Sequence, residues 1–142
     1  MITKQLSIFL ENKTGRLNDV AKILGEADIN MSAFSLADNT DFGILRVIVS
    51  EPEKALTVLK SNKFAVSLTD VICLHAPNTP GSLANILQIL AENGIYIDYM
   101  YAFSDGENDA KVIIRPDKIE DGMKVLQDHK IALIAANDLY KL

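Results

Sequence analysis

Two glycine-containing loops carry the residues of this chain that are best suited to bind a ligand. The first loop has the sequence Asn-Lys-Thr-Gly-Arg-Leu at residues 12–17, and the second has Asn-Thr-Pro-Gly-Ser-Leu at residues 78–83. Glycine lets the backbone approach a ligand closely, because no side chain intervenes. A helix is predicted to begin after each glycine, so its first amides lack an intrahelical partner and lie at the positive end of the helix dipole. Each loop is therefore a candidate site for a carboxylate-sized anion.

The candidate binding residues in these loops form two matching sets. They are Asn12, Thr14, Gly15, Arg16 and Leu17 in the first loop, and Asn78, Pro80, Gly81, Ser82 and Leu83 in the second. For either loop taken alone, a tight turn between a strand and a helix explains the glycine equally well.

The two loops belong to two copies of one unit. Gly15 and Gly81 lie 66 positions apart, and the apolar residues that follow keep this offset through a helix and the next strand. The matching pairs are Leu17 with Leu83, Val20 with Ile86, Ile23 with Ile89, Leu24 with Leu90, Ile29 with Ile95, and Met31 with Ile97. A repeat sets the folding unit. We therefore predict two repeats, at residues 1–69 and 70–142, with the function where the copies face each other.

Hydrophobic patterning predicts the same order of elements in each repeat. The first repeat has predicted strands at 5–10, 29–37, 43–49 and 64–68, and helices at 17–27 and 52–62, the latter capped by Ser50. The second repeat has predicted strands at 71–76, 95–103, 111–115 and 131–135, and helices at 80–93 and 117–129. This βαββαβ order is typical of the ferredoxin-like α+β fold, an antiparallel sheet in the order 4-1-3-2 with both helices on one face.

The two predicted sheets are expected to join side by side. An unpaired second strand would be an exposed edge without protection, so we predict that strands 29–37 and 95–103 pair with each other.

Composition and charge argue against several classes of binding partner. A hydrophobic fraction of 49% and a charged fraction of 23% are typical of a globular protein, and a net charge of −5 argues against a nucleic-acid partner. No apolar run approaches the ~18 residues of a membrane helix, and no secretory signal is evident, so no membrane partner is expected. A single cysteine, Cys73, favours the cytoplasm. Cys73 and His75 lack the further ligands of a zinc site, and no metal or cofactor is predicted.

The second loop and its surroundings resemble a known family. The Asn-x-Pro-Gly-x-Leu loop, the helix after it and the Gly94-Ile95-Tyr96-Ile97 segment are similar to the ACT domain, a small-molecule-sensing ferredoxin-like module. The segment 27–31 of the first copy is similar as well. The resemblance covers essentially the whole chain as a tandem pair with no catalytic domain. The family loop usually begins with Asp, whereas both loops here begin with Asn, and only the second loop has the proline.

The resemblance implies a free amino acid as the ligand. It would be held between the loop of one copy and the start of the second strand of the other, which adds Asn30, Met31, Tyr96, Ile97 and Asp98 to the candidate binding residues. The loop amides would bind the ligand's carboxylate. Acceptors for its ammonium group would be Asn12, Asn30, Asn78 or Asp98, although Asp98 is also explained as a solvated strand residue.

Non-catalytic regulation of an enzyme of amino-acid metabolism is the function that the resemblance implies, and two alternatives stay open. The first is a small acylphosphatase-like hydrolase built from Asn12 and Arg16. Against it, Ser82 replaces Arg16 in the second copy, and no catalytic base is evident. The second alternative is a purely structural dimerisation module.

An aromatic stripe predicts the oligomeric state. Tyr99, Tyr101 and Phe103 take the place of smaller residues in the first copy, and strand alternation puts all three on one sheet face. If that face lacks helices, an apolar surface is exposed, and we predict a homodimer that buries it. The alternative is that the stripe completes the core beneath the helices.

Overall fold

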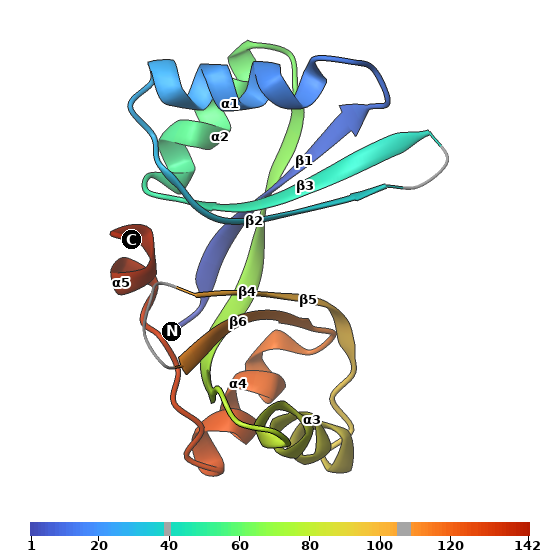
Figure 1. The fold of residues 1–142 in the computed structure, drawn as a ribbon, viewed down its shortest axis with the longest axis vertical. Helices are drawn as coiled ribbons and strands as arrows, with labels where there is room; N and C mark the ends of the chain where they lie inside the picture. Colours follow the sequence, from blue (N-terminus) through green and yellow to red (C-terminus); the bar gives the residue numbers. More distant parts are fainter. Residues whose placement is uncertain (39–40, 105–108) are drawn as a thin grey trace. The chain divides into compact units, whose positions relative to one another are not determined.

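The computed structural model describes residues 1–38, 41–104 and 109–142 (Figure 1). The elements are, in order, β1 (Thr3–Glu11), α1 (Arg16–Glu26), β2 (Met31–Asp38), β3 (Phe42–Val49), α2 (Pro52–Ser61), β4 (Ala65–Pro77), α3 (Ser82–Glu92), β5 (Ile97–Phe103), β6 (Asp109–Pro116), α4 (Ile119–Asp128) and α5 (Ala136–Tyr140).

The chain forms two compact units. The N-terminal unit comprises Lys4–Thr69 together with Asn137–Leu142, and the C-terminal unit comprises Met1–Thr3 together with Asp70–Ala136. The strands follow the order β2-β3-β1-β4-β6-β5. In the N-terminal unit this is the predicted 4-1-3-2 order, with antiparallel pairing of β3 to β1 and to β2. The prediction of two ferredoxin-like α+β repeats with antiparallel sheets is confirmed.

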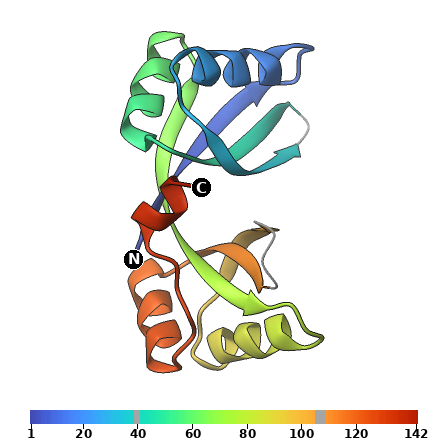
Figure 2. The same cartoon turned by 60° about the vertical axis from the view of Figure 1, so that its left-hand side comes forward.

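In each unit, two long helices cover one face of the sheet (Figure 2). Buried side chains form a separate hydrophobic core in each unit. In the N-terminal unit, alternate strand residues such as Leu6, Ile8 and Val47 pack with Val20 of α1 and Leu59 of α2. The C-terminal core repeats this plan with Ile72, Leu74, Ile114, Leu90 and Leu126. Because strand side chains alternate, only one face of each sheet contributes to these cores.

The two sheets are connected differently from the prediction. The strands predicted at 64–68 and 71–76 form the single 13-residue strand β4, since no glycine, proline or turn sequence interrupts the chain between them. The predicted pairing of 29–37 with 95–103 is wrong, because β2 and β5 stand at opposite ends of the strand order.

The C-terminal segment also departs from the prediction. The strand expected at 131–135 is reduced to one bridge between Leu74 and Leu133. It is held by hydrogen bonds from His75 N to Ala132 O (2.9 Å) and from Ile134 N to Cys73 O (2.9 Å). The five-residue helix α5 follows, and its Leu139 side chain is buried. The Tyr140 hydroxyl accepts a hydrogen bond from Lys4 N (2.7 Å).

The aromatic stripe lies on the helix-free face of its sheet. Tyr101 is opposite Ile113 in the register, whereas Met100 is opposite Ile114, which belongs to the core beneath the helices. The alternative in which the stripe completes that core is therefore wrong. The three aromatic side chains are half-buried, and the exposed large apolar side chain of β5 is Met100 instead.

Candidate functional site

The two glycine loops have the same backbone structure. Gly15 and Gly81 are the N-cap residues of α1 and α3, with left-handed φ angles of 93° and 88° that favour glycine. Matching hydrogen bonds run from Arg16 N to Lys13 O and from Ser82 N to Thr79 O, each 3.3 Å long. Neither N-cap glycine has a side chain that could cap the helix. The amides of the first helical turn that come after Arg16 and Ser82 are therefore available to a ligand.

The first loop lines a cavity of about 280 Å³ in the N-terminal unit. Asn12, Thr14, Arg16 and Leu17 contribute from the loop. Leu36 and Asp38 contribute from the end of β2, and sequence reasoning missed both. The strand register would have found them, since it pairs Leu10 of β1 with Gly43 of β3, and Gly43 in turn with Asp38.

The second loop lines the corresponding cavity of about 330 Å³ in the C-terminal unit. Asn78, Ala102 and Ser104 stand there at the 66-residue offset from Asn12, Leu36 and Asp38. Serine thus replaces Asp38, but Asp109, at the same offset from Gly43, gives the second cavity a carboxylate of its own. Ser82 lines a different cavity, between α3 and β4.

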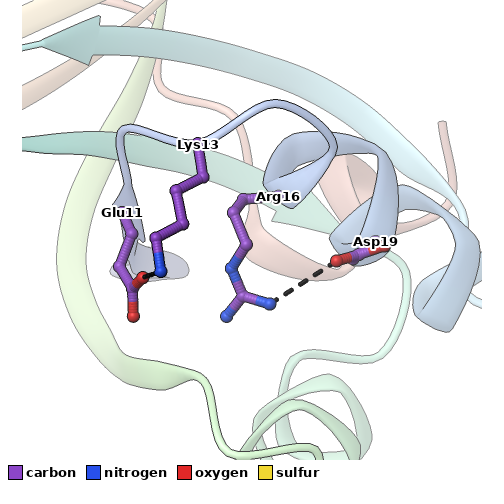
Figure 3. A network of polar contacts seen from close by, with 4 residues as sticks. All are labelled: Glu11, Lys13, Arg16 and Asp19. Carbon is purple, nitrogen blue, oxygen red and sulfur yellow. Dashed lines mark hydrogen bonds and ion pairs between the residues drawn. The ribbon is translucent and has the colours of Figure 1, made fainter.

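Charged side chains surround the first loop (Figure 3). Lys13 Nζ lies 2.9 Å from Glu11 Oε2, and Arg16 Nη1 lies 3.5 Å from Asp19 Oδ2. The hydrogen bond and positive charge of Lys13 hold the pKa of Glu11 below its ordinary value. The Arg16 guanidinium lies over the Phe64 ring, 4.3 Å from its centre. Arg16 is therefore held against the body of its own unit.

The starts of the second strands lie far from the loop of their own unit. The register pairs Met31 with Val49, at the opposite end of β3 from Gly43. Asn30 and Tyr96 instead each form a pair of hydrogen bonds to a residue near the start of the unit's second helix. Asn30 N donates to Ser50 Oγ and Ser50 N to Asn30 O (both 3.0 Å), while Tyr96 N donates to Asp117 Oδ1 (3.0 Å) and Asp117 N to Tyr96 O (2.9 Å).

These hydrogen bonds show that Ser50 does not cap α2, contrary to the prediction, and they define the surroundings of Asn30. Ser50 bonds to Asn30 instead of capping α2, whose N-cap is Glu51. The Asn30 side-chain amide donates to Leu142 O (2.9 Å), which leaves its side-chain oxygen as the acceptor. Ile97 packs against the C-terminal core, and Asp98 is exposed. Within a unit, the structure does not bring these residues to the loop.

The remaining chemistry-bearing side chains are few. Burial raises the pKa of the Cys73 thiol to about 12, with Lys111 opposing that shift. Among residues 1–38, 41–104 and 109–142, no group of three His, Cys, Asp or Glu side chains could hold a metal ion. In the same part of the chain, no helix has the length and apolarity needed to cross a membrane.

Comparison with known families decides the classification. A family model described as an ACT domain pair matches residues 1–142. The chain belongs to the ACT domain pair family. The resemblance seen in the sequence is thereby confirmed over the whole chain. The comparison with curated proteins gave no match.

Solved structures share the fold of this ACT domain pair. The crystal structure of protein BT0572 from Bacteroides thetaiotaomicron is 52% identical, with a TM-score of 0.95 over 100% of this chain and 98% of that chain. The ligand-free regulatory subunit of aspartate kinase from Thermus thermophilus is 16% identical, with a TM-score of 0.63 over 89% of this chain and 93% of that chain. The regulatory subunit from Thermus flavus is 17% identical, with a TM-score of 0.57 over 89% and 92%.

Proposed function

We propose that this ACT domain pair is a non-catalytic regulatory protein that binds a free amino acid at the loops before α1 and α3. The observation that carries the proposal is the repetition of one backbone turn, with a left-handed glycine and an uncapped helix start, beside a cavity in each unit. The ligand's carboxylate would accept hydrogen bonds from the amides after Gly15 or Gly81, where the helix dipole favours an anion.

Each cavity contains a carboxylate that could bind the ligand's ammonium group. The first cavity has Asp38 beside Asn12, and the second has Asp109 beside Asn78. A carboxylate accepts a charge-assisted hydrogen bond from an ammonium group, which is stronger than one between neutral groups. We therefore expect an amino acid to bind at either loop.

A second copy of the chain would supply the starts of β2 and β5. The edge strand β2 exposes Phe34 (63%) and Leu36 (52%), and Leu17 of α1 is 42% exposed. Exposed apolar side chains along an unpaired strand favour association with another chain. Pairing of β2 edges in an antiparallel homodimer would place Asn30 and Met31 of one copy near the loop of the other.

The regulated partner would be an enzyme of amino-acid metabolism. The support is membership of the ACT domain pair family and a fold shared with regulatory subunits of aspartate kinase. The single cysteine favours the cytoplasm as the place where the partners meet.

Amide chemical shifts test the location of the ligand. The amino acid that stabilises the protein most is added to ¹⁵N-labelled protein, and the shift of every backbone amide is recorded. The largest shifts are expected at Gly15, Arg16 and Leu17, followed by their counterparts after Gly81. A ligand whose largest shifts fall away from both loops would refute the proposed site.

A further inference from the structure

The C-terminal unit contains a second kind of cavity, of about 350 Å³, between β4, α3 and the segment after α4. Its polar lining comes from His75, Ser82, Asn85, Asp109 and Lys130. The His75 Nδ1 atom is buried and has no hydrogen-bond partner in the described part of the chain. A buried polar atom without a partner is costly, so a ligand that supplies one gains binding energy there.

In the N-terminal unit, the Arg16 side chain occupies the region that corresponds to this cavity. Arg16, at the position of Ser82, lies over the Phe64 ring and pairs with Asp19. In the C-terminal unit, the Ser82 hydroxyl donates instead to the Pro77 carbonyl, and Asn85 replaces the Asp19 carboxylate. Serine is too short to fill the space, so the cavity stays open in this unit.

The sequence differences between the two units also change the sign of the charge that this cavity favours. A guanidinium is held in the N-terminal unit by an aromatic face and a carboxylate. Ile131 replaces that ring in the C-terminal unit, since its amide donates to Leu126 O as the Phe64 amide donates to Leu59 O. Both of the groups that attract a cation are therefore absent. Lys130 and His75 line the cavity instead, while the one carboxylate, Asp109, is shared with the neighbouring cavity around Asn78.

We propose that this cavity is a separate binding site for the carboxylate group of a small organic acid. The carboxylate would accept hydrogen bonds from the Lys130 ammonium and from Nδ1–H of the His75 imidazole. Charge-assisted bonds of this kind are the stronger ones in proteins. The site goes beyond the proposed function, because it uses neither the amides after Gly81 nor a second copy of the chain.

The two histidines of the chain provide a direct test. Propanoate is titrated into ¹⁵N-labelled protein at constant ionic strength, and the imidazole nitrogen signals are followed. His75 is expected to shift and saturate. His129, whose Nδ1 is 2.9 Å from the Val125 carbonyl oxygen, serves as the internal reference. Unmoved His75 signals, or equal shifts at both histidines, would overturn the proposal.

A parallel titration with guanidinium ion, over the same millimolar concentration range as propanoate, distinguishes an anion site from a cation site. No saturable His75 shift is expected with guanidinium. If guanidinium binds and propanoate does not, the cavity is a cation site like the one that Arg16 occupies, and the proposal fails.

Matched variants connect the signal to the cavity. Ser82→Phe should fill the cavity with an uncharged side chain and abolish the propanoate response. Lys130→Asn should weaken propanoate binding about tenfold through the loss of one charge-assisted bond. Asparagine suits this position because Lys130 has a left-handed φ of 58°. The control is Lys63→Asn, at the same left-handed position of the N-terminal unit, which should leave binding unchanged. Equal effects of both lysine variants would contradict the proposal.

Discussion

Burial controls the chemistry of the single cysteine. The Cys73 side chain is fully buried, and burial raises its pKa from 9.0 to about 12. The thiolate is the reactive form of cysteine. We therefore expect the folded protein to react very slowly with Ellman's reagent at pH 8, and one thiol to react at once after unfolding in urea. Rapid reaction of the folded protein would contradict the buried position of Cys73.

The raised pKa of Cys73 also makes the free energy of unfolding depend on pH in the alkaline range. A thiol whose pKa is higher in the folded state favours folding below its unfolded pKa. That contribution is lost as the pH rises from 9.0 to about 12.

A second residue-scale prediction concerns the pair of Glu11 and Lys13. Lys13→Gln should raise the pKa of Glu11 toward 4.5, because the Lys13 hydrogen bond and charge cause the lowering. Carboxyl ¹³C shifts recorded against pH measure this value. The sign follows from the lowered pKa, so the pair stabilises the folded protein above pH 4.5 and its contribution is lost as the pH falls through the folded value. Lys22→Gln on α1 is the control and should leave Glu11 unchanged.

At the scale of elements, two glycines with different backbone angles should respond oppositely to alanine. Gly81 has a φ of 88°, whereas Gly25 lies inside α1 without a left-handed angle, and a Cβ at either position meets no atom within 4 Å. Gly81→Ala should destabilise the protein by roughly 1 kcal/mol through backbone strain alone. Gly25→Ala should stabilise it by roughly 0.5 kcal/mol. Urea unfolding measures both, and an equal sign for the two variants would be inconsistent with the loop geometry.

The elements that local sequence signals define were predictable. The glycine loops, the helices after them and the hairpin strands follow from turn residues and apolar periodicity. The continuity of β4 was missed because two apolar runs separated by Thr69 and Asp70 look like two strands, although both residues can remain extended. Pairing beyond the hairpins depends on contacts far apart in sequence, and so the places of β2 and β5 at opposite ends of the strand order could not be read from either strand alone. Leu36 and Asp38 were missed for the same reason.

For the whole molecule, we expect self-association through the β2 edge. Phe34→Glu combined with Leu36→Lys removes two exposed apolar side chains without touching either core, so sedimentation equilibrium should give monomers. Met100→Lys on β5, where the wild-type side chain is 40% exposed, is the matched control and should remain dimeric. The parent protein sedimenting as a monomer would show the β2 proposal to be wrong. The half-buried Tyr99 and Tyr101 are less suitable probes, since changing them would also disturb the fold.

The central claim is that an amino acid binds the folded chain, and a thermal-shift screen of the twenty amino acids tests it most directly. A ligand at a hundred times its dissociation constant stabilises the folded state by about 2.7 kcal/mol. We expect at least one amino acid to raise the unfolding temperature in a saturable manner, and a variant with both Gly15→Ala and Gly81→Ala to lose this response. If none of the twenty shifts the parent protein, or if the double variant responds like the parent, amino-acid binding at these loops is contradicted.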